Sequence, residues 1–177
     1  MHIGHAPPPN RGVRPHGFSA MRIEVDEVTR PQVLALLAEH LRNMHEITPQ
    51  EYVFAFDAKK LQTPGVTFWT AWNDEVLLGC AALKELSPTE GELKSMRTPE
   101  RLRGQGVGRA LLNHVLQVAR ERRYRRLFLE TGNHPAFLPA QTLYRSVGFR
   151  ECGPFGAYME NAFSVFMSLS LDGERAS

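Results

Sequence analysis

The first half of the chain after residue 20 contains alternating apolar runs typical of strands and one pattern typical of a helix. In the helical segment, apolar residues recur every three or four positions after a start signal at Thr29 and Pro31. Two β-rich runs flank the turn signal Asn73–Asp74 and predict a hairpin. The elements predicted here are a strand at Met21–Val28, a helix from Pro31 to Met44, and strands at Phe68–Trp72 and Val76–Leu83.

The second half alternates strands with helices. A turn at Ser87–Gly91 leads into the first of these strands. The predicted elements are a strand at Glu92–Thr98, a helix marked by Val107, Leu111, Val115 and Val118, a strand at Arg126–Thr131, a helix at Pro139–Val147 that stops at Gly148, and closing strands at Phe149–Cys152 and Ser164–Leu171. Hairpin strands followed by strand–helix–strand–helix–strand predict an α+β (mixed α/β) domain with one central sheet.

Residues 1–20 differ in composition from the rest of the chain. They contain four prolines and three glycines with hardly any apolar residue, so they cannot bury enough surface to offset their ordering entropy. We therefore predict a disordered N-terminal tail at 1–20, one domain at 21–171 and a short C-terminal tail at 172–177. The polar segment from His45 to Pro64 is expected to form helix or loop over a site.

Composition excludes several classes of protein. The 177 residues suffice for one domain, and no apolar run approaches the ~20 residues that span a bilayer. Two cysteines cannot form a disulfide framework, and without an apolar secretory signal we expect reduced thiols in a cytoplasm. The net charge of +2 argues against a general nucleic-acid or membrane binder. Eight arginines against one acidic residue between Arg101 and Arg126 nevertheless suit a polyanionic ligand.

A glycine-rich loop at Arg103–Gly108 is the most informative motif. It follows a predicted strand and precedes an amphipathic helix. Glycines let the backbone approach a ligand closely, and free N–H groups at a helix start attract anions. Arg109 stands where the last glycine of G-x-G-x-x-G would be, and the G-K-[ST] ending of a Walker loop is missing. The loop therefore predicts an anion site but disfavours the dinucleotide and nucleotide-hydrolase folds.

The loop and a later segment resemble the GNAT family of N-acetyltransferases. The family signature [QR]-x-x-G-x-[GA] has its counterpart in residues 103–108, and Ala140–Phe149 resembles the family's A-x-x-L-Y-x-x-x-G-F segment. Gly91–Thr98 also resembles the strand before the loop in a bacterial subgroup of the family. Taken as a whole, the similarity covers about residues 21–171. It implies a single GNAT-like domain with a central, splayed, mostly antiparallel sheet flanked by helices.

The resemblance implies acetyl-CoA as co-substrate. Loop N–H groups would hold the pyrophosphate, and the end of the preceding strand would pair with the pantetheine amides. Two positions depart from the family pattern: Glu100 replaces a proline, with Pro99 one residue earlier, and Phe137 replaces an asparagine, with Asn133 four residues earlier. The implied cofactor-binding residues are Met96, Arg97, Thr98, Arg103, Gly104, Gln105, Gly106, Val107, Gly108, Arg109 and Asn133.

Acetyl transfer to an amine needs a proton acceptor for the ammonium and donors for the oxyanion and the leaving thiolate. Glu92 matches the catalytic glutamate of the family's histone-acetylating branch and is the first base candidate. Glu130, on the facing strand, is a second candidate and could instead bind the substrate ammonium. Tyr144 matches the family tyrosine that protonates the thiolate. A structural role is left open for each, and His45 is a candidate substrate contact.

Other conspicuous side chains have structural interpretations. Cys80 lies in an apolar strand and is expected in the core, because buried thiols are usually inert. Trp69 and Trp72 are expected to pack in the core or the hairpin. His40 and His45 are five residues apart, whereas two metal ligands on one helix face are usually four apart, so no metal site is expected.

Together these features predict an enzyme that transfers an acetyl group from acetyl-CoA to a primary amine of a small molecule in a ternary complex. A protein lysine or N-terminal acetyltransferase is one alternative, and a non-catalytic acyl-CoA-binding sensor is another. We expect no nucleic-acid or membrane partner. A homodimer, the identity of the acceptor and the preferred acyl chain are left open.

Overall fold

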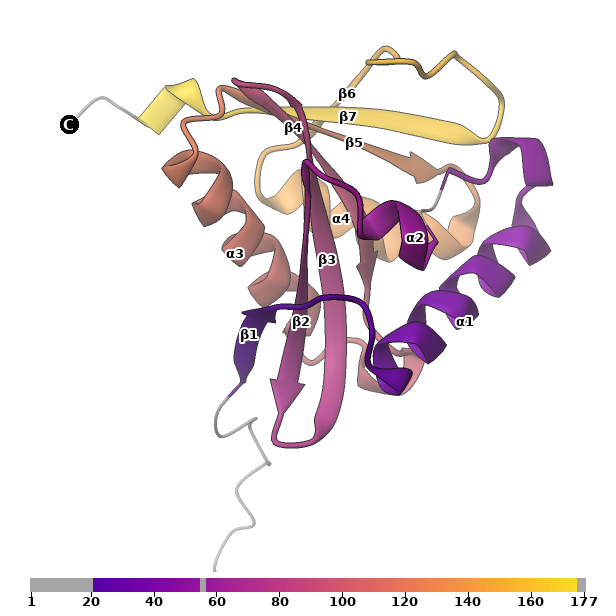
Figure 1. Ribbon diagram of the computed structural model, residues 1–177. Helices are drawn as coiled ribbons and strands as arrows, with labels where there is room; N and C mark the ends of the chain where they lie inside the picture. The colour runs from indigo at the N-terminus through magenta and orange to yellow at the C-terminus, as the bar shows by residue number, and fades with distance from the viewer. Residues whose placement is uncertain (1–20, 55–56, 175–177) are drawn as a thin grey trace, which may run out of the picture.

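The computed structural model describes residues 21–54 and 57–174 (Figure 1). The prediction of a disordered tail at residues 1–20 lies outside the described residues. Within the predicted C-terminal tail, Asp172–Glu174 form a short 3₁₀ helix.

A seven-stranded sheet in the order β1-β2-β3-β4-β5-β7-β6 forms the centre of the molecule (Figure 1). Every neighbouring pair is antiparallel except β4 and β5, which run parallel. This confirms the predicted mixed, mostly antiparallel sheet. The strands are β1 (Arg22–Val25), β2 (Val66–Asn73), β3 (Val76–Ser87), β4 (Glu90–Arg97), β5 (Arg126–Gly132), β6 (Arg150–Cys152) and β7 (Ser164–Ser170).

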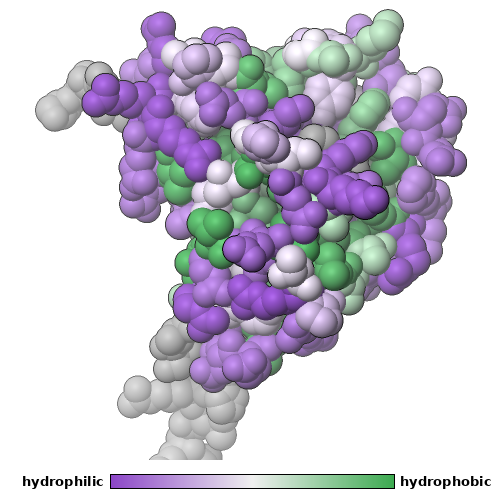
Figure 2. All heavy atoms as spheres, viewed as in Figure 1, coloured by the Kyte–Doolittle hydropathy of each residue, from purple (hydrophilic) through white to green (hydrophobic). Residues whose placement is uncertain are grey.

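Four α-helices cover the two faces of the sheet. On one face lie α3 and α4, and on the other lie α1 and α2. Polar side chains spread over the α1 and α2 side, with apolar residues visible between them (Figure 2). The helices are α1 (Pro31–Ile47), α2 (Ala58–Leu61), α3 (Val107–Glu121) and α4 (Leu138–Ser146), and short 3₁₀ helices occur at Gln50–Tyr52, Glu100–Leu102 and Pro135–Phe137.

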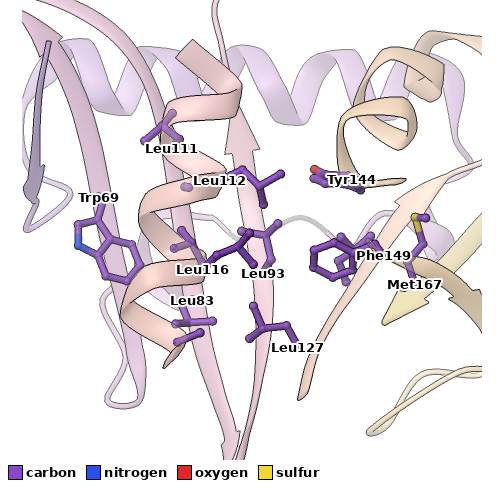
Figure 3. Packing of buried hydrophobic residues seen from close by; sticks show 14 of the residues in the cluster. Trp69, Leu83, Leu93, Leu111, Leu112, Leu116, Leu127, Tyr144, Phe149 and Met167 are labelled. Atoms are coloured by element: carbon purple, nitrogen blue, oxygen red, sulfur yellow. The ribbon is translucent and has the colours of Figure 1, made fainter. Parts of the chain in front are cut away.

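Each face of the sheet has its own hydrophobic cluster. The larger one packs Leu111, Leu112 and Leu116 of α3 against Leu83 and Leu93 of the sheet (Figure 3). It continues to the α4 side through further buried residues, namely Leu127, Tyr144, Phe149 and Met167. The smaller cluster joins α1 and α2 to β2 and β3. The 3.6-residue apolar period of α1 and α3 therefore places each helix on its own face.

The elements agree with the sequence predictions in kind and differ at their ends. The first strand is four residues long, where eight were predicted, because Asp26 already accepts a hydrogen bond from the backbone N–H of Val28 in a turn. The third strand continues past Leu83 to Ser87, and its last residues stay paired with β4. The segment from His45 to Pro64, predicted as helix or loop, contains the end of α1, a 3₁₀ helix and α2.

Candidate active site

The candidate site lies where β4 and β5 separate. Their parallel pairing covers three register pairs and ends at Glu92 and Phe128. Beyond that point, within the described sheet, β4 is paired only with β3 and β5 only with β7. Two strand edges with free backbone groups therefore diverge from each other, and an extended ligand can add to such an edge by β-type hydrogen bonds. The predicted splay of the sheet is confirmed.

A bulge at Ser95 changes which residues of β4 face each side of the sheet. Ser95 has a φ of 51°, and the register with β3 shifts beside it. Strict alternation from Leu93 would place Arg97 on the apolar face and Met96 on the opposite one. The bulge reverses the two: Met96 packs against the α3-side cluster, whereas the guanidinium of Arg97 lies 3.5 Å from Glu39 of α1.

The glycine-rich loop places open backbone at the start of α3. Gly104 and Gly106 have φ values of 75° and 86°, a region that favours glycine, and a Cβ atom on either would meet nothing within 4 Å. A Cβ atom on Gly108 would lie 3.3 Å from Leu143 of α4, so this glycine permits close helix packing. The first N–H groups of α3, beginning at Val107, lack intrahelical acceptors and can bind an anion.

The arginine excess divides into two groups. Three arginines lie beside the loop or in the first turn of α3: Arg101, Arg103 and Arg109. Five lie around the other end of that 15-residue helix, about 22 Å away at 1.5 Å per residue: Arg120, Arg122, Arg123, Arg125 and Arg126. In this second group Arg122 donates to Thr67 Oγ1 at 2.8 Å and Arg125 pairs with Asp172 at 3.1 Å. Only the first group can therefore serve an anion at the loop.

Tyr144 lies buried on α4, on the apolar side of the separated strands (Figure 3). Its ring packs edge to face against Phe149, with the ring centroids 6.0 Å apart. Gln141 fixes α4 to the end of β5, because its side-chain amide donates to the carbonyl of Gly132 at 2.7 Å. Burial raises the pKa of Tyr144 to about 12, and the charge of Glu130 adds to this rise.

Glu92 sits at the point of separation and is 3% exposed. One carboxylate oxygen, Oε1, accepts hydrogen bonds from Lys94 Nζ at 3.0 Å and from the Tyr158 hydroxyl at 2.6 Å. Lys94 also donates to Tyr158 at 2.9 Å, so the three groups form a closed triangle. Burial and the charge of Glu92 raise the pKa of Tyr158. The carboxylate of Glu92 is therefore held in a buried ion pair.

Glu130 lies two residues beyond Phe128, the last residue of β5 that pairs with β4, and is partly exposed. Its carboxylate accepts a hydrogen bond from Ser164 Oγ at 2.8 Å. Burial raises the pKa of Glu130 to about 7, and the charge of Glu92 acts in the same direction, while Ser164 and Lys94 act against the rise. A carboxylate with this pKa can gain and lose a proton near neutral pH.

Four aromatic residues from two separate segments meet over this face, and we call Tyr52, Phe54, Tyr158 and Phe163 the aromatic roof. Tyr52 contacts Phe163 with ring centroids 5.0 Å apart, and Phe54 contacts Tyr158 at 5.1 Å. The carbonyl of Phe54 accepts a hydrogen bond from Lys94 at 3.4 Å, which places the roof over β4. The segment after α1 thus lies beside the β6–β7 loop (Figure 1).

Other predicted site residues lie around this centre. His45 is exposed in the last turn of α1. The Asn133 side chain donates to the carbonyl of Ala162, so it fastens the β6–β7 loop. Phe137, at the position where the family has asparagine, lies directly against Gly132. The part in cofactor binding predicted for Asn133 stays a prediction.

Sequence reasoning missed Lys94, Tyr158 and Ser164, the partners of the two glutamates. Alternation along β4 could have indicated Lys94, because it shares a face with Glu92. Tyr158 lies in an irregular loop 66 positions from Glu92, and no local pattern links the two. The predicted packing roles are confirmed: Cys80, Trp69 and Trp72 are buried, and burial raises the pKa of the Cys80 thiol to about 12.

Residues 21–54 and 57–174 include no helix that is both long and apolar enough to cross a lipid bilayer. The same part of the chain does not gather three His, Cys, Asp or Glu side chains into a possible metal site.

The fold and the glycine-rich loop are those of a known protein family. The model of the Acetyltransferase (GNAT) family matches residues 31–149, which contain strands β2 to β5 and helices α1 to α4. The chain belongs to the GNAT family of acetyltransferases.

Individual relatives agree with this assignment. YsnE of Bacillus subtilis, described as an uncharacterized N-acetyltransferase, is 45% identical over 85% of this chain and 100% of its own length. YedL of Escherichia coli, described in the same way, is 44% identical over 84% of this chain and 94% of its own length. An acetyltransferase of Bacillus subtilis solved in complex with CoA has the same fold, with a TM-score of 0.62 and 21% identity over 86% of this chain and 99% of its own. The chain is therefore a GNAT-type N-acetyltransferase.

Proposed function

We propose that the protein transfers an acetyl group from acetyl-CoA to the primary amine of a small molecule, by direct attack in a ternary complex. The observation that carries the proposal is the separation of β4 and β5 between the glycine-rich loop and the partly exposed carboxylate of Glu130. This arrangement provides an anion site, a free strand edge and a titratable group. Acetyl transfer to an amine uses all three.

The loop and strand fit a CoA thioester. The open space over Gly104 and Gly106 and the free N–H groups at Val107–Arg109 suit a pyrophosphate. The free edge of β4 at Met96–Thr98 suits the amides of a pantetheine arm. When bound, acetyl-CoA supplies the thioester, an acyl group with a good leaving group. A CoA complex of a protein with the same fold supports this choice.

The chain's own residues supply proton transfer. The acceptor amine must lose a proton before its lone pair attacks the thioester carbonyl carbon, because an ammonium of pKa near 10.4 is almost fully protonated at neutral pH. The C–N bond then forms as the C–S bond breaks, and the thiolate takes up a proton. We assign proton acceptance to the pair Glu92 and Glu130, with Glu130 as the direct acceptor because Glu92 is bound to Lys94. Tyr144 is assigned as the proton donor to the thiolate.

The aromatic roof supports a small acceptor over a protein segment. It joins the segment after α1 to the β6–β7 loop by two ring contacts across the face on which an acceptor would lie. A lysine side chain of a folded protein needs an open groove at this place. The partly exposed Glu130, which accepts a hydrogen bond from Ser164 next to Phe163 of the roof, also argues against a sensor that only binds acyl-CoA, since a sensor needs no titratable group there.

A screen of primary amines with the purified protein tests the proposal, with free thiol release as the readout. We expect at least one small amine to release CoA from acetyl-CoA well above the rate of hydrolysis. The product should carry an acetyl group on nitrogen when analysed by mass spectrometry. Acetyl-CoA binding without release by any amine would favour the sensor, and acetylation of a folded protein alone would favour the protein acetyltransferase.

A further inference from the structure

Three buried polar atoms at the junction of α1 with the end of β4 lack a hydrogen-bond partner among the described residues. They are His40 Nδ1, Ser95 Oγ and Arg97 Nε. Buried polar side-chain atoms are bonded in the great majority of cases, so three unpartnered atoms in one place call for an explanation. A bound ligand that supplies the missing partners is one explanation with chemical content.

Several contacts place these residues together. The guanidinium of Arg97 lies 3.5 Å from Glu39, the neighbour of His40 on α1. Burial lowers the pKa of His40 to about 4, and the charge of Arg97 lowers it further. Cys80 pairs in register with Arg97, and its thiol lies 3.3 Å from the carbonyl of Ser95. We call His40, Ser95 and Arg97 the α1 corner.

The α1 corner has an excess of positive charge. The Arg97 side chain is 12% exposed, and its one ion pair among the described residues is the long contact to Glu39, whose side chain is 42% exposed. Burial lowers the pKa of Arg97, and the nearby charge of Arg103 acts in the same direction. A largely buried guanidinium whose one carboxylate partner among the described residues lies 3.5 Å away is costly, so an anion that binds beside it gains from both charge and hydrogen bonding.

A negative group that complements Arg97, the carboxylate of Glu130, lies on the same side of the separated strands. The buried charges of Glu92 and Lys94 compensate each other, so Glu130 is the carboxylate of the described, separated part of β4 and β5 that an ammonium can use. A molecule with an amine and a carboxylate would complement both Glu130 and Arg97. A plain amine would leave the guanidinium of Arg97 without a close counterion.

We propose that the acceptor is an aminocarboxylate, whose carboxylate binds Arg97 and His40 while its amine faces Glu130. This inference rests on the proposed acetyl transfer and names the substrate class. The Nε and Nη2 atoms of Arg97 form a planar fork that matches the two oxygens of a carboxylate. Ser95 Oγ and a ring nitrogen of His40 add donors. Both His40 and Arg97 are partly exposed, so the α1 corner borders solvent.

The test compares aminocarboxylates, each with its own carboxamide, as acceptors. We would use α-amino acids and ω-amino acids of increasing chain length, because the chain length reports the spacing between amine and carboxylate sites. Wild-type kcat/KM should favour the best carboxylate over its carboxamide by about 10- to 100-fold, as expected for charge-assisted hydrogen bonds. The ratio is the readout, since it cancels changes in cofactor binding that affect both acceptors equally.

Two variants should lower the ratio to different extents, and a third should raise it. Arg97→Gln should bring it close to one, mainly by lowering kcat/KM for the carboxylate. Arg97→Lys keeps the charge without the fork and should give an intermediate ratio, which also covers the case that the glutamine variant does not fold. Glu39→Gln removes the competing carboxylate and should raise the ratio. Equal wild-type rates for both acceptors, or equal losses for both in Arg97→Gln, would overturn the inference and leave acetyl transfer standing.

A binding measurement separates this inference from the proposed function. The CoA-loaded protein is titrated calorimetrically with the same aminocarboxylates. Binding that is lost in Arg97→Gln supports the α1 corner as a carboxylate site even if no amine releases thiol, in which case the acetyl transfer proposal fails alone. Absence of binding by every aminocarboxylate, together with absence of a preference in turnover, contradicts the carboxylate site.

Discussion

Alternate residues of β4 and β5 face two contrasting environments. Toward α3 and α4, Leu93, Leu127 and Leu129 are almost completely buried in a cluster of apolar side chains. Toward α1 and the β6–β7 loop, Glu92 and Glu130 lie beside charged and hydroxyl groups. The two environments are one residue apart along each strand.

The contrast shows how one pair of strands can serve stability and chemistry at once. The apolar face anchors both strands although their mutual hydrogen bonding stops after three pairs. The other face is thereby free to carry ionisable groups at the edge of the separated region. The predictions below test whether this division holds, in order of the size of the expected effect.

The largest effect is expected at Glu130, on the polar face. If Glu130 accepts the proton of the acceptor amine, Glu130→Gln should lower turnover at neutral pH by about 10²–10⁴-fold. The pKa of about 7 gives the sign of the pH dependence: below it the carboxyl is protonated and cannot accept, so wild-type kcat/KM should fall as pH drops through about 7. A pH–rate profile with a saturating co-substrate measures this limb.

Glu92→Gln is the matched control for that profile. If Glu130 is the direct acceptor, the acid limb should persist in this variant at reduced rate and move to lower pH, because the charge of Glu92 no longer helps to raise the pKa of Glu130. If Glu92 is the base instead, its variant should lose most at neutral pH and recover as pH rises, because the amine then deprotonates unaided. Loss of the limb in Glu92→Gln but not in Glu130→Gln would reverse our assignment of the two glutamates.

The next largest effect is expected on the free energy of unfolding, and it concerns the ion pair between Glu92 and Lys94 on the polar face. Lys94→Met leaves the carboxylate of Glu92 buried without its ion partner, and both side chains are under 10% exposed. Breaking such a pair costs about 3–5 kcal/mol of unfolding free energy. The double variant Glu92→Gln/Lys94→Met should recover most of the loss. Urea unfolding measures the stability of the single and the double variant. Equal losses in the two would show that the unpaired charge of Glu92 does not cause the destabilisation.

The contrast between the faces also explains which features the sequence could predict. Helices, strands and the apolar cluster follow from local periodicity, and the glycine loop follows from six adjacent residues. The orientation of Met96 and Arg97 could not be predicted, because the bulge at Ser95 reverses the alternation and leaves no sequence mark. The bonding of Glu92 depends on Tyr158, 66 positions away. Local patterns therefore predicted the positions of the two glutamates, whereas their different hydrogen-bond partners arise from tertiary contacts.

A smaller effect is expected at Tyr144, the polar group within the apolar face. Tyr144→Phe keeps the ring in its contact with Phe149 and removes the hydroxyl. A phenol whose pKa is about 12 is a weak acid toward a thiolate, so we expect a loss of turnover near the lower end of the usual range, about 10²-fold. Acetyl-CoA affinity should hold. Raising the pH should not restore the rate, since it supplies no proton to the thiolate.

The smallest effect is expected at the arginines of α3, the helix that builds the apolar face and exposes charge at both ends. Arg109 stands in its first turn beside the glycine loop, whereas Arg125 lies beyond its other end and pairs with Asp172. Arg109→Gln should weaken acetyl-CoA binding about 3- to 10-fold, as expected for one charge-assisted contact, and the loss should shrink at high salt. Arg125→Gln is the matched control and should leave the affinity within about twofold, because the length of the helix separates it from the loop. Calorimetric titration at two salt concentrations measures both variants. Equal weakening by the two would mean that the phosphates respond to the total charge of the helix, and the division of the arginines into two groups would then have no part in binding.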